Sequence, residues 1–234
     1  MIEKSDFETF LYISKNLYTI FVDDKQNSKN LYKQEFKIDN EINLDDLSYL
    51  SKFLDENIYK IEKLVGNFIK DITLIIENEK ILNTDIGIKK KNFKQLLNQN
   101  NIKNYLTELK DSFKENYQDQ VIMHMIINNF DESSIKNLSH VSVTNEEYLY
   151  LSVRFISISN NVTFLFEKLL EKHQIQVNQY MSGEYIQNFF SKDLNELSMM
   201  ASKLKNGFNK NEVRLISKNI ENKGFFEKFF QLFS

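Results

Sequence analysis

The sequence predicts an α+β fold, in which a mixed sheet is packed by two or more amphipathic helices and is followed by a helical C-terminal appendix. Residues 148–155, "YLYLSVRF", alternate apolar and polar side chains with the period of a half-buried strand. Residues 44–68 instead place an apolar side chain at every third or fourth position, which is the period of an amphipathic helix. With 234 residues, of which 41% are hydrophobic, the chain is long enough to bury a sizeable core.

The predicted strands are segments rich in β-branched and aromatic residues. Residues 17–38 predict two strands around a polar turn from Asp23 to Asn30. We expect one sheet to contain the segments 71–76, 80–89, 120–129 and 148–157, packed by the helices 44–68 and 161–173. A further short strand is expected at 175–180.

Polar residues predict where the long helix begins. Asn43 is the expected cap, and Asp45 and Asp46 are expected in the first turn, where the helix dipole favours carboxylates. The apolar stripe of the helix consists of Leu47, Leu50, Leu54, Ile58, Ile61, Leu64, Val65 and Phe68.

The segment around residue 150 also admits a helix. In that alternative Tyr148, Leu151, Phe155 and Ile158 share one side. The β-branched content and the strict alternation favour the strand.

The remaining periodic segments predict helices. These segments are 91–98, 102–117, 184–190, 193–205 and 211–221. We therefore divide the chain into an α+β body, 1–183, and a helical tail, 184–234, which ends in an amphipathic helix.

Composition and motifs exclude several kinds of chemistry. The chain has no cysteine, which excludes thiol catalysis, disulfides and thiolate metal sites. Its N-terminus has acids where a signal peptide is apolar, and no run approaches about 20 apolar residues, so we expect a cytoplasmic protein. No phosphate-binding or nucleophile motif can be built from the five glycines, Gly66, Gly87, Gly183, Gly207 and Gly224.

The histidines give no metal site. His124, His140 and His173 lie far apart, and none has a second ligand at the spacing of a helical turn. His124 falls in an apolar strand, so we expect it to be a hydrogen-bonded structural residue. We therefore expect no catalytic residue, no metal and no cofactor.

The charged clusters have simple interpretations. Asp23 and Asp24 lie in a predicted turn, where we expect them to be solvated or to act as caps. The densest basic run, "KKKNFK" at 89–94, is expected to be a solvated helix start, and a net charge of −3 argues against nucleic acid as a partner of the whole chain.

The C-terminus, "GFFEKFFQLFS", is the most unusual stretch. As a helix it places six apolar residues within about 160° of arc, with Lys223 and Lys228 close by. These apolar residues are Phe225, Phe226, Phe229, Phe230, Leu232 and Phe233. Such a face is covered by the body of the protein, by a partner's groove or by a bilayer surface.

Residues 57–81, "NIYKIEKLVGNFIKDITLIIENEKI", predict the end of a helix followed by a strand. They resemble the helix and strand that enter subdomain 1C of FtsA, the actin-like protein that tethers the bacterial division ring to the membrane. "VIMHMIINNFDESSIKNL" (121–138) and "LYLSVRFISISNNVTFLFEKLLEKHQIQV" (149–177) are similar to strands and a helix of that subdomain. "GFFEKFFQLFS" stands where FtsA has its membrane-targeting helix.

The chain also departs from the FtsA pattern. It is about half as long, and the missing part corresponds to the second actin lobe, which closes the nucleotide cleft. At the first phosphate loop the family has an aspartate and a glycine, whereas residues 12–20 are "YISKNLYTI". Because a backbone without glycine cannot approach phosphates closely, we expect no ATP binding.

The resemblance implies a non-enzymatic cell-division adaptor, peripheral on the inner face of the cell membrane. Its partners would be division proteins or further copies of itself, with no nucleic acid and no small-molecule substrate. The alternative is a small accessory protein of a phage, plasmid or regulatory system, whose Phe-rich helix packs in its own core or in a partner groove.

Overall fold

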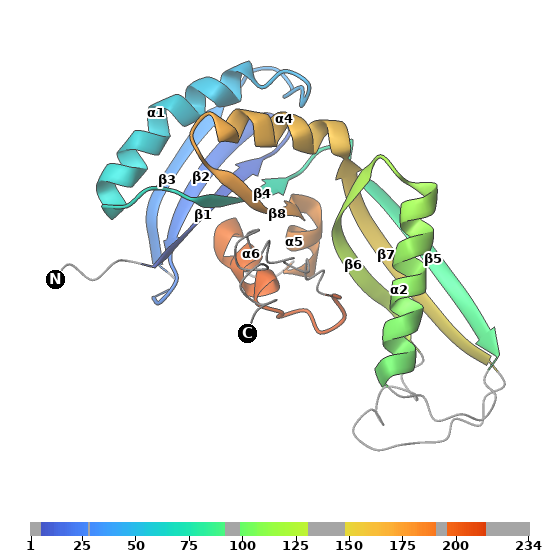
Figure 1. The fold of residues 1–234 in the computed structure, drawn as a ribbon. Helices are drawn as coiled ribbons and strands as arrows, with labels where there is room; N and C mark the ends of the chain where they lie inside the picture. Colours follow the sequence, from blue (N-terminus) through green and yellow to red (C-terminus); the bar gives the residue numbers. More distant parts are fainter. Residues whose placement is uncertain (1–5, 28, 92–98, 131–147, 191–195, 214–234) are drawn as a thin grey trace, which may run out of the picture.

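A computed structural model describes residues 6–27, 29–91, 99–130, 148–190 and 196–213, which form two sheets and their covering helices (Figure 1). The large sheet has the strand order β3-β2-β1-β4-β8. Its strands are β1 (Phe7–Ile13), β2 (Leu17–Asp24), β3 (Lys29–Lys37), β4 (Asp71–Ile76) and β8 (Gln176–Ser182). Strands β1, β4 and β8 are parallel, whereas β1, β2 and β3 form an antiparallel meander.

The small sheet is antiparallel and has the order β5-β7-β6. Its strands are β5 (Leu82–Lys91), β6 (Gln120–Phe130) and β7 (Tyr148–Ser159). The prediction that these strands share a sheet with 71–76 is therefore wrong, although each segment is a strand. Alternation within a segment shows which side chains share a face, but it does not show which strand lies alongside.

The helices cover both faces of the large sheet and one face of the small sheet (Figure 1). On one side of the large sheet lie α1 (Ser48–Val65) and α4 (Asn160–Glu171), and on the other side lie α5 (Gly183–Phe189) and α6 (Leu197–Lys205). Helix α2 (Gln99–Asn116) packs on the small sheet. The mixed sheet with packed helices confirms the predicted α+β class.

Helix α1 starts later than the sequence predicts. Its N-cap is Leu47, which makes no side-chain capping bond, so the prediction of Asn43 as the cap is wrong. The side chains of Asn43 and Asp46 instead accept hydrogen bonds from the backbone N–H groups of Asp45 and Ser48. These local bonds stabilise a turn before the helix, in competition with the helical conformation.

The C-terminal end of α1 is fixed by a glycine. Gly66 has φ 67° and donates its backbone N–H to the carbonyl of Glu62. This left-handed conformation is easy for glycine and ends the helix before Phe68, whose side chain is 74% exposed.

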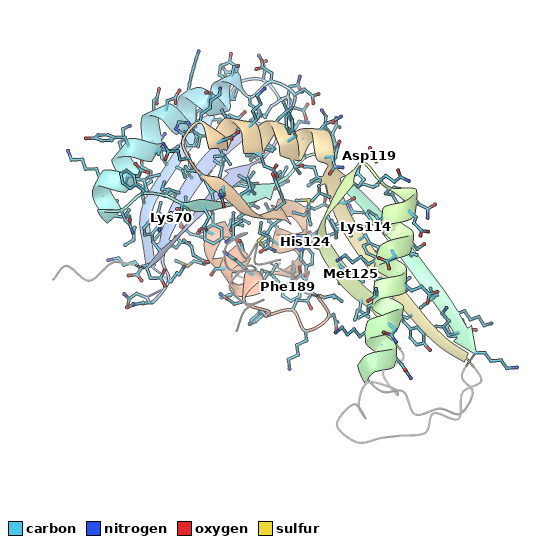
Figure 2. All side chains as sticks on the ribbon, viewed as in Figure 1. Lys70, Lys114, Asp119, His124, Met125 and Phe189 are labelled. Carbon is cyan, nitrogen blue, oxygen red and sulfur yellow. The ribbon has the colours of Figure 1, made fainter. Side chains whose placement is uncertain are left out.

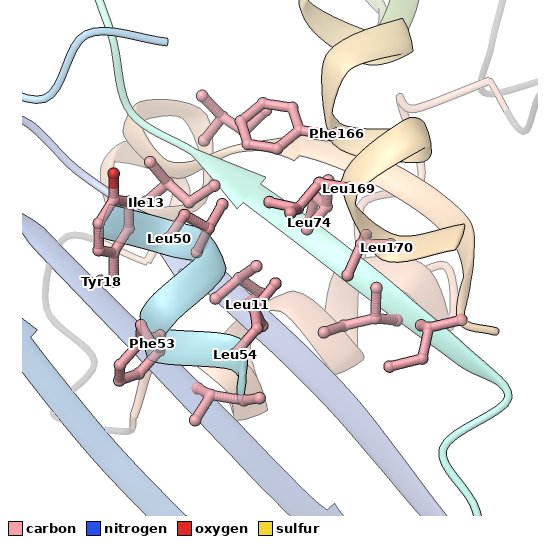
Figure 3. Packing of buried hydrophobic residues seen from close by; sticks show 14 of the residues in the cluster. Leu11, Ile13, Tyr18, Leu50, Phe53, Leu54, Leu74, Phe166, Leu169 and Leu170 are labelled. Atoms are coloured by element: carbon pink, nitrogen blue, oxygen red, sulfur yellow. The ribbon is translucent and has the colours of Figure 1, made fainter. Parts of the chain in front are cut away.

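The main core lies between the large sheet and the helices α1 and α4 (Figure 3). Leu50 and Leu54 of α1 are fully buried against the strand residues Leu11 and Leu74, and Phe166 of α4 is buried beside them. Burial of each such side chain contributes roughly 1.5–3 kcal/mol. The apolar stripe predicted for 44–68 is therefore confirmed as the face by which α1 binds the sheet, but its buried residues extend only as far as Ile61. Leu64 is 58% exposed, and Phe68 lies beyond the end of the helix.

A second core lies on the opposite face of the large sheet. It joins α5 and α6, which belong to the predicted tail 184–234, to the sheet through Phe10, Phe21, Ile75, Met181, Ile186, Phe190, Met200, Ala201 and Leu204. Ser182 caps α5 by accepting a hydrogen bond from the backbone N–H of Tyr185.

Several boundaries differ from the prediction. β1 is absent from the predicted strands, and residues 211–213, where a helix is predicted, instead include an isolated bridge between Glu212 and Ile126. The rest of the predicted helix 211–221, residues 92–98 and residues 193–195 lie outside the described residues. Lys91 belongs to strand β5, and the strand at 148–155 is confirmed over its helical alternative.

Leu109 and Phe113 of helix α2 are fully buried against the small sheet, and Phe113 is the larger of the two. Its ring is fully buried and stacks on Phe155 of β7 at a centroid distance of 4.6 Å. We expect Phe113→Ala to lower the free energy of unfolding by about 3–5 kcal/mol, because it leaves a cavity. Urea unfolding followed by circular dichroism measures the loss.

Tyr59→Ala is the matched control, since the Tyr59 side chain is 71% exposed. It should change the stability by less than about 0.5 kcal/mol. Equal effects of the two substitutions would contradict the packing of α2 on the small sheet.

Candidate interaction site

The parallel strands β1, β4 and β8 end at the same edge of the large sheet, where ligands bind in many α/β proteins. The turn that follows β1 is Ser14–Asn16, in which the Ser14 N–H donates to the Leu17 carbonyl at 2.9 Å. This turn has the sequence "SKN". It contains no glycine that would let a phosphate approach the backbone closely.

Three side chains fill the same edge. The Tyr12 hydroxyl donates to Glu77 Oε2 at 2.5 Å, and Gln187 Nε2 donates to the same oxygen at 2.7 Å. Burial, together with the nearby Glu77 carboxylate, raises the pKa of the Tyr12 phenol well above its ordinary value. Tyr12 is therefore a neutral hydrogen-bond donor rather than a base.

Gly183 lets α5 approach this edge. A Cβ atom at position 183 would lie 3.1 Å from the Glu77 Cβ and 3.2 Å from Tyr12 Cε2, which is closer than most real contacts. The edge is thus closed by the protein's own side chains. No group of three or more histidines or carboxylates that could hold a metal occurs in the described ranges.

A buried histidine connects the two sheets. His124 of β6 accepts a hydrogen bond at Nε2 from the backbone N–H of Ser182, at the end of β8, at 2.9 Å. Because a backbone N–H can only donate, Nε2 carries no hydrogen, and Nδ1–H donates to Glu212 Oε1 at 2.6 Å. The prediction of a hydrogen-bonded structural histidine is confirmed, and Figure 2 shows its place on β6.

Glu212 extends the contact to helix α5. The Tyr185 hydroxyl donates to Glu212 Oε2 at 3.1 Å and accepts from Asn209 Nδ2 at 2.7 Å. Burial is the main cause that raises the pKa of Tyr185, so it stays a donor at neutral pH. We call His124, Glu212 and Tyr185 the clamp, because they join β6, α5 and the segment after α6.

The face of the small sheet opposite α2 carries polar and aromatic side chains. This open face consists of Asp85, Gly87 and Lys89 of β5, Tyr150, Ser152 and Arg154 of β7, and Asn128 of β6. Tyr150 is 55% exposed, and Lys89 Nζ lies over its ring at 5.1 Å. A rigid sheet that exposes a tyrosine and cations is a surface suited to bind another macromolecule.

An ion pair fixes the middle of the open face. Arg154 donates from Nε and Nη2 to the two carboxylate oxygens of Asp85, at 2.9 Å each, and Asn128 donates to Asp85 at 2.9 Å. The hydrogen bonds from Arg154 lower the pKa of Asp85, so this carboxylate stays ionised at neutral pH.

A groove of about 510 Å³ lies beside β1, β2 and α6. Asp23 in its wall is 6% exposed, so the expectation that Asp23 is solvated is wrong. Burial raises its pKa, and Asn30 donates to Asp23 Oδ1 at 3.0 Å. Glu8 at the same groove is held by Lys205 at 2.9 Å and by Ser202 at 3.0 Å. Glu8 thus fastens α6 to the sheet, and Asp23 of β2 holds the first residues of β3 beside it.

The sequence-predicted site residues are not among these features. Lys223, Phe225, Phe226, Lys228, Phe229, Phe230, Leu232 and Phe233 all lie outside the described residues. The basic run 89–94 is corrected in part: Lys89, Lys90 and Lys91 end strand β5 and do not start a helix.

Sequence reasoning missed the open face, although a signal was present. In β5 the residues Asn83, Asp85, Gly87, Lys89 and Lys91 alternate with less polar positions, which marks one solvated face. The clamp has no such signal, because Glu212 lies 88 residues from His124.

Comparison with known proteins does not assign a family. No family model and no curated protein sequence matches the chain. Among solved structures, the PilM–PilN type IV pilus biogenesis complex matches with TM-score 0.47 and 9% identity, over 79% of this chain and 50% of that chain.

Two further structures are less similar in arrangement. The cytoplasmic domain of EpsL, an inner membrane component of the type II secretion system of Vibrio cholerae, gives TM-score 0.37 and 9% identity, over 77% of this chain and 57% of that chain. A protein of unknown function with an actin-like ATPase fold from Bacteroides thetaiotaomicron gives TM-score 0.35 and 14% identity, over 81% and 58%.

The chain thus spans between 50% and 58% of the length of these matched chains. With TM-scores below 0.5, these likenesses assign neither a family nor an activity to this chain. The class that the chain's own structure defines is an α+β protein of two sheets with an exposed sheet face.

Removal of the Glu212 carboxylate tests the clamp. Glu212→Ala leaves the Nδ1–H of His124 and the hydroxyl of Tyr185 without their acceptor, so we expect the free energy of unfolding to fall by about 1–3 kcal/mol. Glu212→Gln keeps one acceptor and should cost less. Urea unfolding compares the variants.

The control is Glu171→Ala, an exposed position at the end of α4. It should leave stability within about 0.5 kcal/mol of the wild type. If Glu212→Ala is no more destabilising than this control, the clamp does not hold the two sheets together.

Proposed function

We propose that this protein is a non-enzymatic adaptor, which binds a protein partner through its α+β body and the inner surface of the cell membrane through its C-terminal segment. The observation that carries the proposal is the open face, a rigid sheet surface held at a fixed orientation by the clamp. It offers an exposed tyrosine, an ion pair and a cation over a ring.

The edge formed by β1, β4 and β8 supports a role without catalysis. Tyr12 and Gln187 both donate to Glu77, so this carboxylate is already engaged at the place where a phosphate or metal would be bound. The turn after β1 also lacks the glycine that the FtsA family has there. We therefore propose that the protein binds no nucleotide.

The C-terminal composition supports attachment to a membrane. Residues 201–234 hold seven basic and three acidic residues, and the terminal segment adds six apolar side chains in an amphipathic pattern. Lys223 and Lys228 would contribute roughly 1 kcal/mol each near an anionic surface. Among the described residues no helix has both the length and the apolar character of a membrane span.

Cell division is the finer proposal, and it rests on the resemblance to FtsA. In this proposal the partners are division proteins or further copies of the chain, and the site of action is the inner face of the membrane. The quoted stretches 57–81, 121–138 and 149–177 include β4 of the large sheet, most of β6 and β7 of the small sheet, and helix α4, but not β5.

An aromatic surface patch favours a second candidate, an accessory protein whose Phe-rich segment packs on its own body. Phe189 and Phe208 are 39% and 61% exposed, and their rings lie 6.2 Å apart in an edge-on contact. Phe190 lies 5.6 Å from Phe208. Such a patch is chemically suited to hold further phenylalanines.

Liposome co-sedimentation tests the membrane proposal. We expect the full chain to pellet with vesicles that contain anionic lipid, and Phe229→Glu to stay in the supernatant, because a charge in the apolar arc opposes insertion. Phe68→Glu is the matched control, since it changes an exposed phenylalanine of the body that is 74% exposed.

The two candidates give opposite results. If the wild type ignores anionic vesicles and Phe229→Glu lowers the melting temperature by several degrees, the phenylalanines pack on the body and the membrane proposal is wrong. If Phe68→Glu abolishes binding as well, the attachment does not reside in the terminal segment.

Fluorescent tagging in the host tests the division proposal. A fusion at the N-terminus leaves the terminal segment accessible, and we expect a band at midcell that Phe229→Glu disperses. A uniform signal along the membrane supports the membrane-adaptor proposal but contradicts the cell-division proposal. A diffuse signal of the wild type contradicts both proposals.

A further inference from the structure

The two edges of the small sheet differ. The outer edge of β6 is covered by the protein's own chain, because Ile127 N–H donates to the Asn211 carbonyl at 2.9 Å and Val213 N–H donates to the Met125 carbonyl at 2.8 Å. On β5, all strand partners in the described ranges lie on β7, and Figure 1 shows β5 along the outer side of the small sheet. A ten-residue edge strand is a template for a further strand.

We propose that β5 pairs with β5 of a second copy of this chain, antiparallel and symmetric about Gly87. A two-fold axis through Gly87 sets Ile86 opposite the second copy's Ile88, and Asp85 opposite its Lys89. Residues directly opposite each other in an antiparallel pair point to the same side of the sheet. The two small sheets would therefore continue into one, with both α2 helices on one side and both open faces on the other.

The register follows from complementary side chains. In this pairing each Lys89 meets an ionised Asp85, and the isoleucines meet each other on the face that α2 covers. A symmetric pairing centred on Ile88 would also form Lys–Asp pairs, with Lys91 opposite Asp85, but it would set Lys90 opposite Ile86, which places a charge beside an apolar residue. The contact between the isoleucines therefore decides between these two registers. Centring on Ile86 would remove the Lys–Asp pairs altogether.

The lysines of β5 do not oppose the pairing. Lysines on edge strands often prevent association, but here Lys91 meets Asn83 and Lys90 meets Thr84, so no like charges stand directly opposite. Asp85 retains room for a further donor, because its side chain is 48% exposed beside Arg154.

Gly87 is the second observation that points to this axis. Glycine in a strand interior weakens the strand and often marks close approach of another backbone. Within the chain a Cβ at Gly87 would meet only ordinary contacts, at 3.6 Å and 3.9 Å, and the φ of Gly87 is not positive. The fold of one copy therefore gives no reason for glycine here. The symmetric pairing sets two copies of position 87 directly opposite each other, with Cβ positions about 4.5–5.5 Å apart, where a small residue such as glycine or cysteine fits.

The proposed dimer does not depend on the proposed function, but dimerisation would strengthen attachment to a membrane. Two copies joined at β5 present two C-terminal segments together, and linked weak sites gain avidity through effective concentration.

Analytical ultracentrifugation of the full chain tests the association over a range of protein concentrations. We expect a monomer–dimer equilibrium, and we expect Lys89→Glu to raise the dissociation constant about tenfold or more, because both attractive pairs become repulsive. Lys60→Glu, an exposed lysine of α1 in the other part of the molecule, is the charge-matched control and should leave the constant unchanged.

Cysteine cross-linking tests the register, since the chain has no cysteine of its own. Cα atoms directly opposite each other in an antiparallel pair lie about 4.5–5.5 Å apart, within the range of a disulfide. Gly87→Cys should therefore form a covalent dimer on mild oxidation. Asn83→Cys should not form one alone, because its two copies lie roughly 27 Å apart, but it should cross-link when mixed with Lys91→Cys.

A chain that is monomeric at every concentration, with no covalent dimer from Gly87→Cys, overturns the proposal, whether or not another protein occupies β5. A dimer that persists unchanged in Lys89→Glu, or that is cross-linked by Asn83→Cys alone, shows a different interface and also overturns it. Circular dichroism of each variant confirms that it is folded.

Discussion

The imidazole of His124 is the point on which the arrangement of the two sheets depends. It lies in β6 of the small sheet, receives the backbone N–H that ends β8 of the large sheet, and donates to Glu212 beyond α6. With an exposed fraction of 0% for the His124 side chain, both hydrogen bonds are shielded from water, so loss of either leaves a buried polar group without a partner. A hinge at this junction would thus be costly, and the open face keeps one orientation relative to the rest of the body.

The small sheet belongs to the chain between β4 and α4, two elements of the large-sheet layer. β4 continues into β5, and β7 leads directly into α4 through the capping residue Ser159. Both connections are short, and the clamp adds a third link from the far end of the chain. The small sheet is therefore an insertion held by three links, which suits a surface that presents side chains to a partner. The two edges of the small sheet differ in backbone pairing. Residues 211–213 pair with β6, whereas β5 has β7 as its strand partner within the described residues.

At the carboxyl ends of β1, β4 and β8, the protein's own side chains occupy the edge of the large sheet where many α/β proteins bind ligands. The parallel strands converge there as in proteins that bind ligands at the carboxyl ends of strands. In this chain a tyrosine, a glutamate and a glutamine satisfy one another, and Gly183 allows α5 to approach them. These hydrogen bonds stabilise the fold, and because of them the edge has less space and fewer free donors for a ligand.

The sequence by itself determined the local structure of individual segments. It also excluded several kinds of chemistry, above all that of cysteine. The alternation at 148–155 and the 3.6-residue period at 47–61 reflect backbone geometry within one segment, so the strand and the helix could be predicted from their own residues. The cysteine-free composition was equally plain. The start of α1 was less certain in principle, because Asn43 and Asp46 serve equally well as caps and as turn residues.

Only the tertiary structure decided which faces meet. Strand 71–76 and strand 148–159 could each be predicted from their own residues, yet they belong to different sheets, because pairing depends on the packing of distant segments. The same holds for His124 with Glu212, which are 88 residues apart, and for Tyr12 with Glu77, which are 65 residues apart. No local period encodes such contacts, since they form only when burial of the two cores brings the segments together.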